Sequence, residues 1–583
     1  MLHTLSRSLR ENKGSALVTV LLSALEVVFE IVIPLFMSNL IDFGIEGGSM
    51  AAVWKFGAFL LLLAAFQLAT GVLAARIAAR ASVGFAANLR EDMFDNVQTF
   101  AFSNIDKFST ASIVTRLTTD TTNVQNAFQM LMRMAIRAPV MLIFSMIVSF
   151  RISRDISMTF LIILPILALA LFFIIRSVFP VFSRVFRTYD ELNNVVQENV
   201  RGIRVVKSFN QERHEIGKFG AISERIYKDF SKGERLITLN APLMQFCIYT
   251  CMIAISWLGA KAIIASGNDP ALGLTTGNLT ALITYTMQIL SSLMMLSMVF
   301  AMLTISLSSA RRIAEVLEER SDIPQPEQPV MTVRDGAVDF DHVSFVYASK
   351  ADKKVLDDID LHIRSGETIG IIGGTGASKS SLVQLIPRLY DVTGGKLTLG
   401  GLDVRDYDLD TLRGAVAMVL QKNELFSGTI AENLRWGNEN ATDEELRHAC
   451  ELACADGFIS AMPDGYDTHI EQGGTNVSGG QKQRLCIARA LLKKPKVLIL
   501  DDSTSAVDTR TDAQIQQALS TCIPDTTKII IAQRISSVQN ADRIVVLDDG
   551  HIDAVGCHDE LLRTCEIYRE VYESQQKGGE DDA

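Results

Sequence analysis

Residues 371–381, Ile-Ile-Gly-Gly-Thr-Gly-Ala-Ser-Lys-Ser-Ser, decide the fold of the second half of this chain. An apolar run ending at Ile372 precedes the glycines, as a strand would, and residues 382–389 follow with a helical pattern. A strand, a glycine-rich turn, a lysine and hydroxyls at a helix start form the arrangement of a phosphate-binding loop. Backbone N–H groups would curl round the phosphates, and Lys379 would add a full positive charge. The stretch therefore predicts a phosphate site in an α/β domain, the alternative being a chance glycine-rich loop.

The residues of this loop are themselves the candidate phosphate ligands. Ser380 is also placed to ligate Mg²⁺. Ser378 stands where the usual pattern has its second glycine. A serine keeps the backbone N–H, so we expect nucleotide binding to survive, although the fit of its side chain depends on a backbone angle that the pattern does not give. The candidate set is Gly373, Gly374, Thr375, Gly376, Ala377, Ser378, Lys379, Ser380 and Ser381.

Hydropathy divides the 583-residue chain into two halves of different composition. Several apolar runs of membrane-spanning length lie before about residue 310, whereas the composition after residue 337 is that of a soluble domain. The net charge of −11 and the lack of a concentrated basic arm exclude nucleic acid as the expected partner. The eight cysteines have no regular spacing, so we expect neither disulfides nor a metal site.

Six apolar segments are each long enough to cross a bilayer core of about 30 Å. Basic residues concentrate in the long second and fourth connections, which the positive-inside rule places in the cytoplasm together with both chain ends. Arg151 and Arg154, in the short third connection, run against that rule. We expect a multi-pass protein of the cell membrane, with spans at about 15–41, 51–82, 131–151, 157–180, 238–265 and 277–305.

The remaining connections define the domain plan. The long connections have a helical pattern, so the spans are expected to continue into the cytoplasm, with short transverse helices near 112–118 and 205–212. Residues 321–336 contain three prolines and no apolar period, which is typical of a linker. The predicted fold is a six-span α-helical membrane domain over 1–320, this linker, and an α/β nucleotide-binding domain with a largely parallel sheet over 337–583.

Two carboxylates follow a second apolar strand. Residues 496–500 deliver Asp501 and Asp502 to the carboxyl end of that strand, beside the phosphate loop. Asp501 would hold the Mg²⁺ shell, and Asp502 stands where a general base would orient the attacking water. Residues 476–484, Asn-Val-Ser-Gly-Gly-Gln-Lys-Gln-Arg, present a serine, two glycines and a glutamine at a predicted helix start, again suited to a phosphate.

These motifs, in this order, resemble those of ATP-binding cassette exporters of the half-transporter kind over nearly the full length of the chain. The resemblance implies ATP and Mg²⁺ as cofactors, Tyr347 as the residue that stacks on adenine, and Gln421 as a contact of the metal and the water. It identifies 477–481 as the signature motif, with Ser478, Gly479, Gly480 and Gln481 closing over ATP held by a partner subunit. It also implies that the segments near 112–118 and 205–212 are coupling helices.

Three residues depart from the family pattern, and all three lie on the half-site built with this chain's own phosphate loop. Asp502 replaces a glutamate base, Gln533 replaces a histidine, and Ser378 replaces a glycine. Asp502 is one methylene shorter than glutamate, and Gln533 cannot carry an imidazole's charge. The signature keeps its serine, glycines and glutamine, with only a leucine-to-valine change.

This asymmetry favours a heterodimer over a homodimer. Loss of a well-placed base costs about 10²–10⁴ in rate, and a homodimer would carry that defect at both sites. In a heterodimer the site completed by this chain's signature would remain competent. We expect ATP-driven export of drugs, lipids or other amphipathic small molecules with a homologous half-transporter subunit. The alternatives are a homodimeric exporter and an ATP-gated channel or regulatory membrane protein.

The cargo path is the least specified part of the sequence. Glu26 and Glu30 lie one turn apart in the first span, where ionisable groups are costly unless they face a cavity. They would favour cationic or amphipathic cargo; the alternatives are solvent exposure near the outer end and pairing with a partner subunit. Met287, Met294 and Met298 recur at helical spacing in the sixth span, which suits either a promiscuous cargo surface or helix packing.

Overall fold

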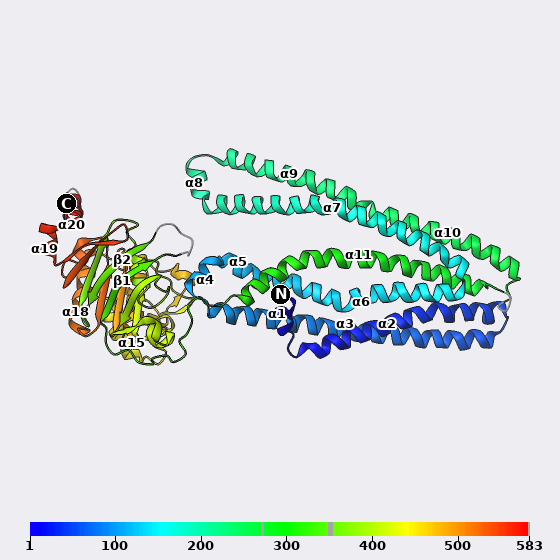
Figure 1. Cartoon of the computed structure of the whole chain (residues 1–583), viewed down its shortest axis with the longest axis horizontal. Coiled ribbons are helices and arrows are strands. Elements are labelled where there is room, and N and C mark those ends of the chain that lie inside the picture. Colours follow the sequence, from blue (N-terminus) through cyan, green and yellow to red (C-terminus); the bar gives the residue numbers. More distant parts are fainter. Residues whose placement is uncertain (270–272, 348–353, 581–583) are drawn as a thin grey trace. The chain divides into compact units, whose positions relative to one another are not determined.

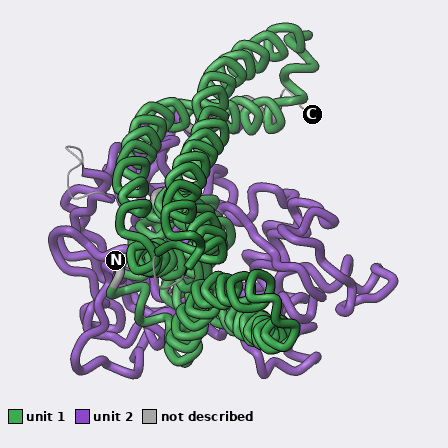
Figure 2. Tube along the Cα trace, turned by 90° about the vertical axis from the view of Figure 1, so that its right-hand side faces the viewer, with its two compact units in different colours: residues 1–98, 110–319 green, residues 99–109, 320–583 purple. Residues whose placement is uncertain are grey.

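A computed structural model describes residues 1–269, 273–347 and 354–580. The chain forms two compact units, coloured separately in Figure 2. Unit 1 comprises residues 1–98 and 110–319, and unit 2 comprises residues 99–109 and 320–583. The boundaries predicted for the membrane domain, the linker and the nucleotide-binding domain remain predictions. The sequence did not indicate that residues 99–109 belong to unit 2.

Unit 1 is helical, and its described residues form six helices long and apolar enough to cross a membrane, as predicted. Several run well beyond the apolar segments; α3 alone has 49 residues. Two π-helical turns, Leu40–Glu46 and Arg116–Asp120, interrupt or precede the long helices. The helices are α1 (Leu2–Arg7), α2 (Asn12–Asn39), α3 (Met50–Gln98), α5 (Thr110–Thr115), α6 (Thr121–Ile152), α7 (Arg154–Arg201), α8 (Ile203–Ser208), α9 (Glu212–Thr238), α10 (Asn240–Ser266) and α11 (Thr276–Glu318).

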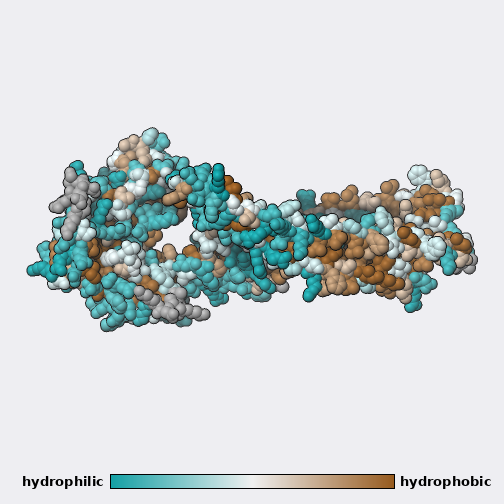
Figure 3. All heavy atoms as spheres, turned by 90° about the horizontal axis from the view of Figure 1, so that it is seen from above, coloured by the Kyte–Doolittle hydropathy of each residue, from teal (hydrophilic) through white to brown (hydrophobic). Residues whose placement is uncertain are grey.

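Within unit 1, α2, α3, α6 and α11 pack together, while α7, α9 and α10 form a second group (Figure 1). Tyr285 on α11 is fully buried and donates a hydrogen bond of 2.6 Å to the backbone oxygen of Ile31 on α2. Large apolar side chains nevertheless cover much of the outer surface of the spans (Figure 3), including Leu161, Trp257 and Ile264. An apolar outer surface on helices of this length is the pattern expected where lipid replaces water.

Unit 2 is an α/β domain built on a six-stranded sheet of order β12-β11-β3-β10-β9-β6. Strand β9 is buried along its whole length, because parallel neighbours and helices cover it on both sides. The strands of this sheet are β3 (Thr368–Gly373), β6 (Val416–Val419), β9 (Val497–Asp501), β10 (Thr527–Ile531), β11 (Arg543–Asp548) and the antiparallel edge strand β12 (His551–Gly556).

Unit 2 also contains a four-stranded antiparallel sheet, β2-β1-β4-β5, and a two-stranded ribbon, β7-β8. These strands lie outside the largely parallel sheet that the sequence predicts. They are β1 (Val338–Phe345), β2 (Leu356–Ile363), β4 (Gly394–Leu399), β5 (Leu402–Asp403), β7 (Gly428–Thr429) and β8 (His469–Ile470). The helices of unit 2 are α4 (Phe102–Lys107), α12 (Lys379–Gln384), α13 (Leu409–Ala415), α14 (Ile430–Arg435), α15 (Asp443–Leu452), α16 (Asp456–Ser460), α17 (Gly479–Leu492), α18 (Thr509–Cys522), α19 (His558–Thr564) and α20 (Glu566–Glu580).

The short helix α4 belongs to unit 2 although it follows the second membrane span. Tyr390 donates a hydrogen bond of 2.8 Å from its hydroxyl to Asp106, and its ring lies 6.0 Å from that of Phe102. Asn104 donates to the backbone oxygen of Arg320. Residues 112–118, the first predicted coupling segment, lie in α5 and the π-helical turn Arg116–Asp120 of unit 1, and their coupling role stays a prediction. The second predicted segment, 205–212, contains most of α8 and the start of α9.

Candidate nucleotide site

The phosphate loop leaves the carboxyl end of β3 and enters α12. Lys379, the first residue of α12, donates from Nζ to the backbone oxygens of Gly373 at 2.8 Å and Gly374 at 2.9 Å. Burial lowers the pKa of this lysine, while the carboxylates of Asp501 and Asp502 act in the opposite direction. These hydrogen bonds hold the start of the loop to the Lys379 side chain. The central residues 374–376 are exposed and accessible to a ligand from solvent.

Ser378 adopts the left-handed conformation, with φ of 68° and ψ of 20°. This is the angle that the sequence pattern could not give, and it is one that favours glycine, because a Cβ there costs about 1–2 kcal/mol. The loop therefore holds Ser378 under backbone strain while still presenting its N–H. Replacement of the usual glycine has a cost in the protein's own stability.

Substitution of Ser378 by glycine should relieve that strain. We expect S378G to raise the free energy of unfolding of the nucleotide domain by about 1 kcal/mol, since a positive φ suits glycine. Thermal denaturation of the purified protein measures the change, with S378A as the matched control because alanine keeps the penalty. Equal melting temperatures for S378G and S378A would contradict this prediction.

Asp501 ends β9 beside the start of α12. It is 3% exposed, and its carboxylate is hydrogen-bonded to the hydroxyl of Ser380. Burial raises the pKa of the Asp501 carboxyl, whereas that hydrogen bond and Lys379 lower it. Two of the three predicted metal ligands, Ser380 and Asp501, are thus brought together, and a hydroxyl and a carboxylate are the hard oxygen ligands that Mg²⁺ prefers.

Asp502 is held by two glutamines that are distant in the sequence. Its Oδ2 accepts a hydrogen bond of 2.8 Å from Gln533 Nε2 and a longer one of 3.4 Å from Gln421 Nε2. The backbone of Asp502 is left-handed, with φ of 48°. Burial raises the pKa of its carboxyl, and the two amide donors act in the opposite direction. The structure therefore assembles all three residues predicted to be catalytic, with the carboxylate engaged by amides.

Tyr347 lies near α12, with its ring 46% exposed. Its hydroxyl shares a hydrogen bond of 2.8 Å with Ser381. The rings of Phe345 and Tyr390 contact it edge-on at 4.8 Å and 5.0 Å. The hydroxyl of Ser381, a predicted phosphate ligand, is thus used to position the predicted adenine-stacking ring. Tyr390 was not predicted from the sequence, because a single tyrosine outside a motif carries no local signal.

The 478–481 segment starts helix α17. Ser478 is the N-cap, and its hydroxyl accepts from Gln481 N while Gln481 Oε1 accepts from Ser478 N, forming a capping box. A Cβ on Gly480 would lie 2.8 Å from the backbone oxygen of Ala506, so only glycine fits there. Gln483, which the sequence analysis did not select, bonds to Ala506 N and the Ser505 hydroxyl. These contacts join the helix start to the loop after β9.

The two span carboxylates meet a basic residue that the sequence analysis missed. Arg137 on α6 donates to Glu26 at 2.8 Å and to Glu30 at 2.7 Å, both on α2. The arginine could have been found from sequence, because it interrupts the predicted third span. The two carboxylates are therefore paired within this chain. Helix packing in unit 1 does not bury the three methionines of α11: Met287, Met294 and Met298 are 42%, 47% and 66% exposed.

Comparison with known proteins identifies the family. Residues 16–294 match the family described as ABC transporter transmembrane region, and residues 356–505 match the family described as ABC transporter. The chain is 35% identical over 558 residues to the uncharacterized ABC transporter ATP-binding protein YfiB of Bacillus subtilis (strain 168), with 96% of each chain covered. The chain belongs to the ABC transporter family.

Two further relatives agree with this assignment. This ABC transporter is 34% identical over 490 residues to the uncharacterized ABC transporter ATP-binding protein YknU of Bacillus subtilis (strain 168), covering 84% and 83% of the two chains. Its fold matches the structure of a bacterial Atm1-family ABC exporter with ATP bound, with a TM-score of 0.82, 24% identity, and 97% and 99% coverage.

The predicted fold class is thus confirmed: six candidate membrane helices precede an α/β ATPase domain in one chain. This is the half-transporter arrangement of ABC exporters, which function as dimers and contact the bilayer and a transported substrate. The ABC transporter is a multi-pass membrane protein whose ATPase domain binds and hydrolyses ATP to drive transport.

Proposed function

We propose that this ABC transporter is one subunit of a heterodimeric exporter of amphipathic small molecules, and that the ATP site on its own phosphate loop hydrolyses slowly. The main support for this proposal is the environment of Asp502, which stands at the position of the base. Its carboxylate accepts hydrogen bonds from Gln533 and Gln421. A carboxylate already engaged by two amides, and one methylene short of glutamate, is poorly placed to take a proton from water.

The residues of the site support ATP binding with Mg²⁺. The exposed backbone of 374–376, with Lys379, Ser380 and Ser381, would surround the phosphates, and Tyr347 would stack on the adenine. Ser380, Asp501 and the carbonyl oxygen of Gln421 would hold Mg²⁺, which when bound neutralises phosphate charge. The remaining defect lies in the base and its neighbour, so this site would hold ATP while turning it over slowly.

The signature segment is built to serve the other site of the dimer. Its capping box leaves the first backbone N–H groups of α17 at a positive helix end, which is suited to a γ-phosphate. Ser478, Gly479, Gly480 and Gln481 would therefore complete a competent site on the partner's phosphate loop. We place both chain ends on the cytoplasmic face of the cell membrane, as the distribution of basic residues indicates.

ATPase assays on purified dimers test this function. The chain alone should hydrolyse ATP about 10²-fold more slowly than the chain co-expressed with a homologous half-transporter that carries glutamate and histidine at the two altered positions. Equal rates would favour a homodimer. ATP-dependent accumulation of an amphipathic dye in inside-out vesicles separates an exporter from an ATP-gated channel, because a channel cannot move the dye uphill.

The cluster of Arg137, Glu26 and Glu30 in unit 1 allows a test of the proposed class of cargo. Two carboxylates share one guanidinium, and Glu30 is partly exposed whereas Glu26 is buried, so a cationic portion of a cargo molecule would be attracted to Glu30. We expect E30Q to lower export of cationic dyes relative to neutral dyes of similar size. Unchanged selectivity in vesicle uptake would remove Glu30 from the cargo path.

Arg137 has a separate, structural consequence. R137Q would leave Glu26, only 8% exposed, without its counter-charge, and should lower the free energy of unfolding by about 2 kcal/mol. R137K keeps the charge but cannot bridge both carboxylates, so it should recover only part of the loss. Thermal denaturation of the purified transporter measures both variants, and equal stability of R137Q and the wild type would refute the pairing.

A further inference from the structure

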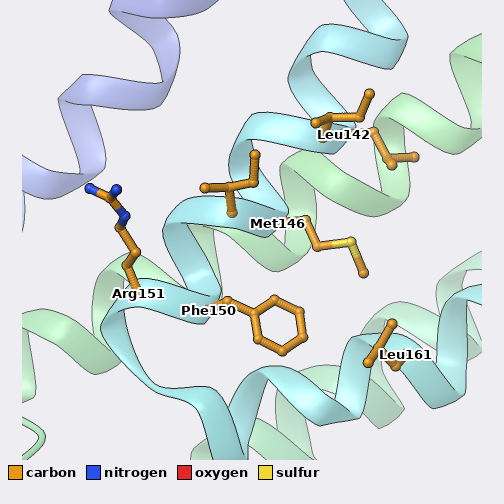
Figure 4. Close-up of a pocket in the computed structure, with 7 residues that line it drawn as sticks. Leu142, Met146, Phe150, Arg151 and Leu161 are labelled. Atoms are coloured by element: carbon orange, nitrogen blue, oxygen red, sulfur yellow. The ribbon is translucent and has the colours of Figure 1, made fainter.

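A groove on unit 1, between α6 and α7, has no role in the proposed function. Its volume is about 500 Å³, within the range of roughly 300–1,000 Å³ typical of ligand sites. Six apolar side chains line it, with Arg151 at one end (Figure 4). The apolar set is Leu142, Ile143, Met146, Ile147 and Phe150 on α6, and Leu161 on α7.

The groove lies in the membrane-spanning part of both helices. α6 and α7 are two of the six candidate spans, and three of the lining side chains are about half exposed: Ile143 at 52%, Ile147 at 48% and Leu161 at 49%. Exposed apolar side chains in a span face lipid tails rather than water. The groove is therefore suited to bind a lipid acyl chain, whereas a soluble ligand would have to enter it through the bilayer.

Arg151 supplies a charge at the polar end of the groove. It is exposed in the last turn of α6, and the chain leaves the helix two residues later at Ser153. Among the described residues Arg151 makes no ion pair, and the carboxyl end of α6 favours a cation there without providing a counter-anion. In Figure 4 its guanidinium extends to the opposite side from Phe150, away from the apolar lining.

We propose that this groove binds an anionic phospholipid, with one acyl chain along α6 and α7 and the phosphate on Arg151. A guanidinium binds phosphate through two parallel charge-assisted hydrogen bonds, and an arginine at a span end reaches the headgroup level. The bound lipid also accounts for a basic residue in a short connection that runs against the positive-inside rule. This inference does not depend on the heterodimer or on the transported cargo.

Lipid-dependent stabilisation of the purified transporter tests the site. The transporter in neutral detergent is titrated with phosphatidylglycerol or phosphatidylcholine, and the melting temperature is followed, since a ligand of the native state raises it by mass action. Phosphatidylglycerol should act at lower concentration than phosphatidylcholine. R151Q should weaken the phosphatidylglycerol response about tenfold, and I147W, which fills the groove, should also weaken it.

Arg154 provides the matched control. It is exposed and lies three residues beyond Arg151, but it does not line the groove and is followed by Asp155. R154Q should therefore keep the wild-type response, and glycerol phosphate without acyl chains should give none. Equal loss in R151Q and R154Q, an unchanged response in I147W, or equal effects of the two lipids on the wild type would each overturn the proposal.

Discussion

Replacing Ser478 by arginine should reduce ATP hydrolysis by the assembled transporter about 10²–10³-fold, the cost of losing preorganised donors around a developing charge. The substitution removes the N-cap of α17 and places a large side chain where the partner's γ-phosphate would sit. Because the proposed competent site is the one completed by this signature, its loss should stop nearly all turnover. Steady-state phosphate release by the co-purified dimer measures the effect.

Loss of the helix cap by itself must be separated from loss of the phosphate site. Thr442 offers the control, because it begins α15 with the same capping box, to Glu445. T442R should cost only about 1 kcal/mol of stability and leave the ATPase rate within about twofold of wild type. Comparable rates for S478R and wild type would show that the working site does not use this signature.

Repairing the base is the second large effect expected. In the S478R background only the site on this chain's own phosphate loop remains, so its slow turnover can be measured alone. Adding D502E and Q533H should raise that rate by about 10²-fold, because the longer carboxylate reaches the water and the imidazole replaces the amide now bonded to Oδ2. Single-turnover hydrolysis of radiolabelled ATP measures the gain.

The single substitutions D502E and Q533H show how much of the rate increase each residue contributes. D502E should give the larger part, and Q533H alone should free Asp502 from its 2.8 Å amide donor without lengthening it. If D502E produces no increase, aspartate serves adequately as the base and the slow-site proposal fails. The pH dependence of the hydrolysis rate provides a second measurement. Because burial raises the pKa of the Asp502 carboxyl, this carboxyl should become protonated, and lose its activity as a base, at a higher pH than a solvent-exposed aspartate.

Features carried by contiguous residues were predictable. The apolar runs gave the six spans, and the glycine-rich turn between an apolar strand and a helix gave the phosphate loop. The buried strand β9 brought Asp501 to the loop because parallel strands end at one edge of the sheet. The short strands β5, β7 and β8 were missed, since two residues have no periodicity to detect.

By itself the sequence determined the domain types, the family and the three departures at Ser378, Asp502 and Gln533, because period, composition and motif spacing are local properties of the chain. Only the tertiary structure decided which side chains meet. Gln421 and Gln533 reach Asp502 from 81 and 31 residues away, and Arg137 reaches Glu26 across 111 residues. Such pairings depend on how helices and strands pack, and no local pattern encodes that packing.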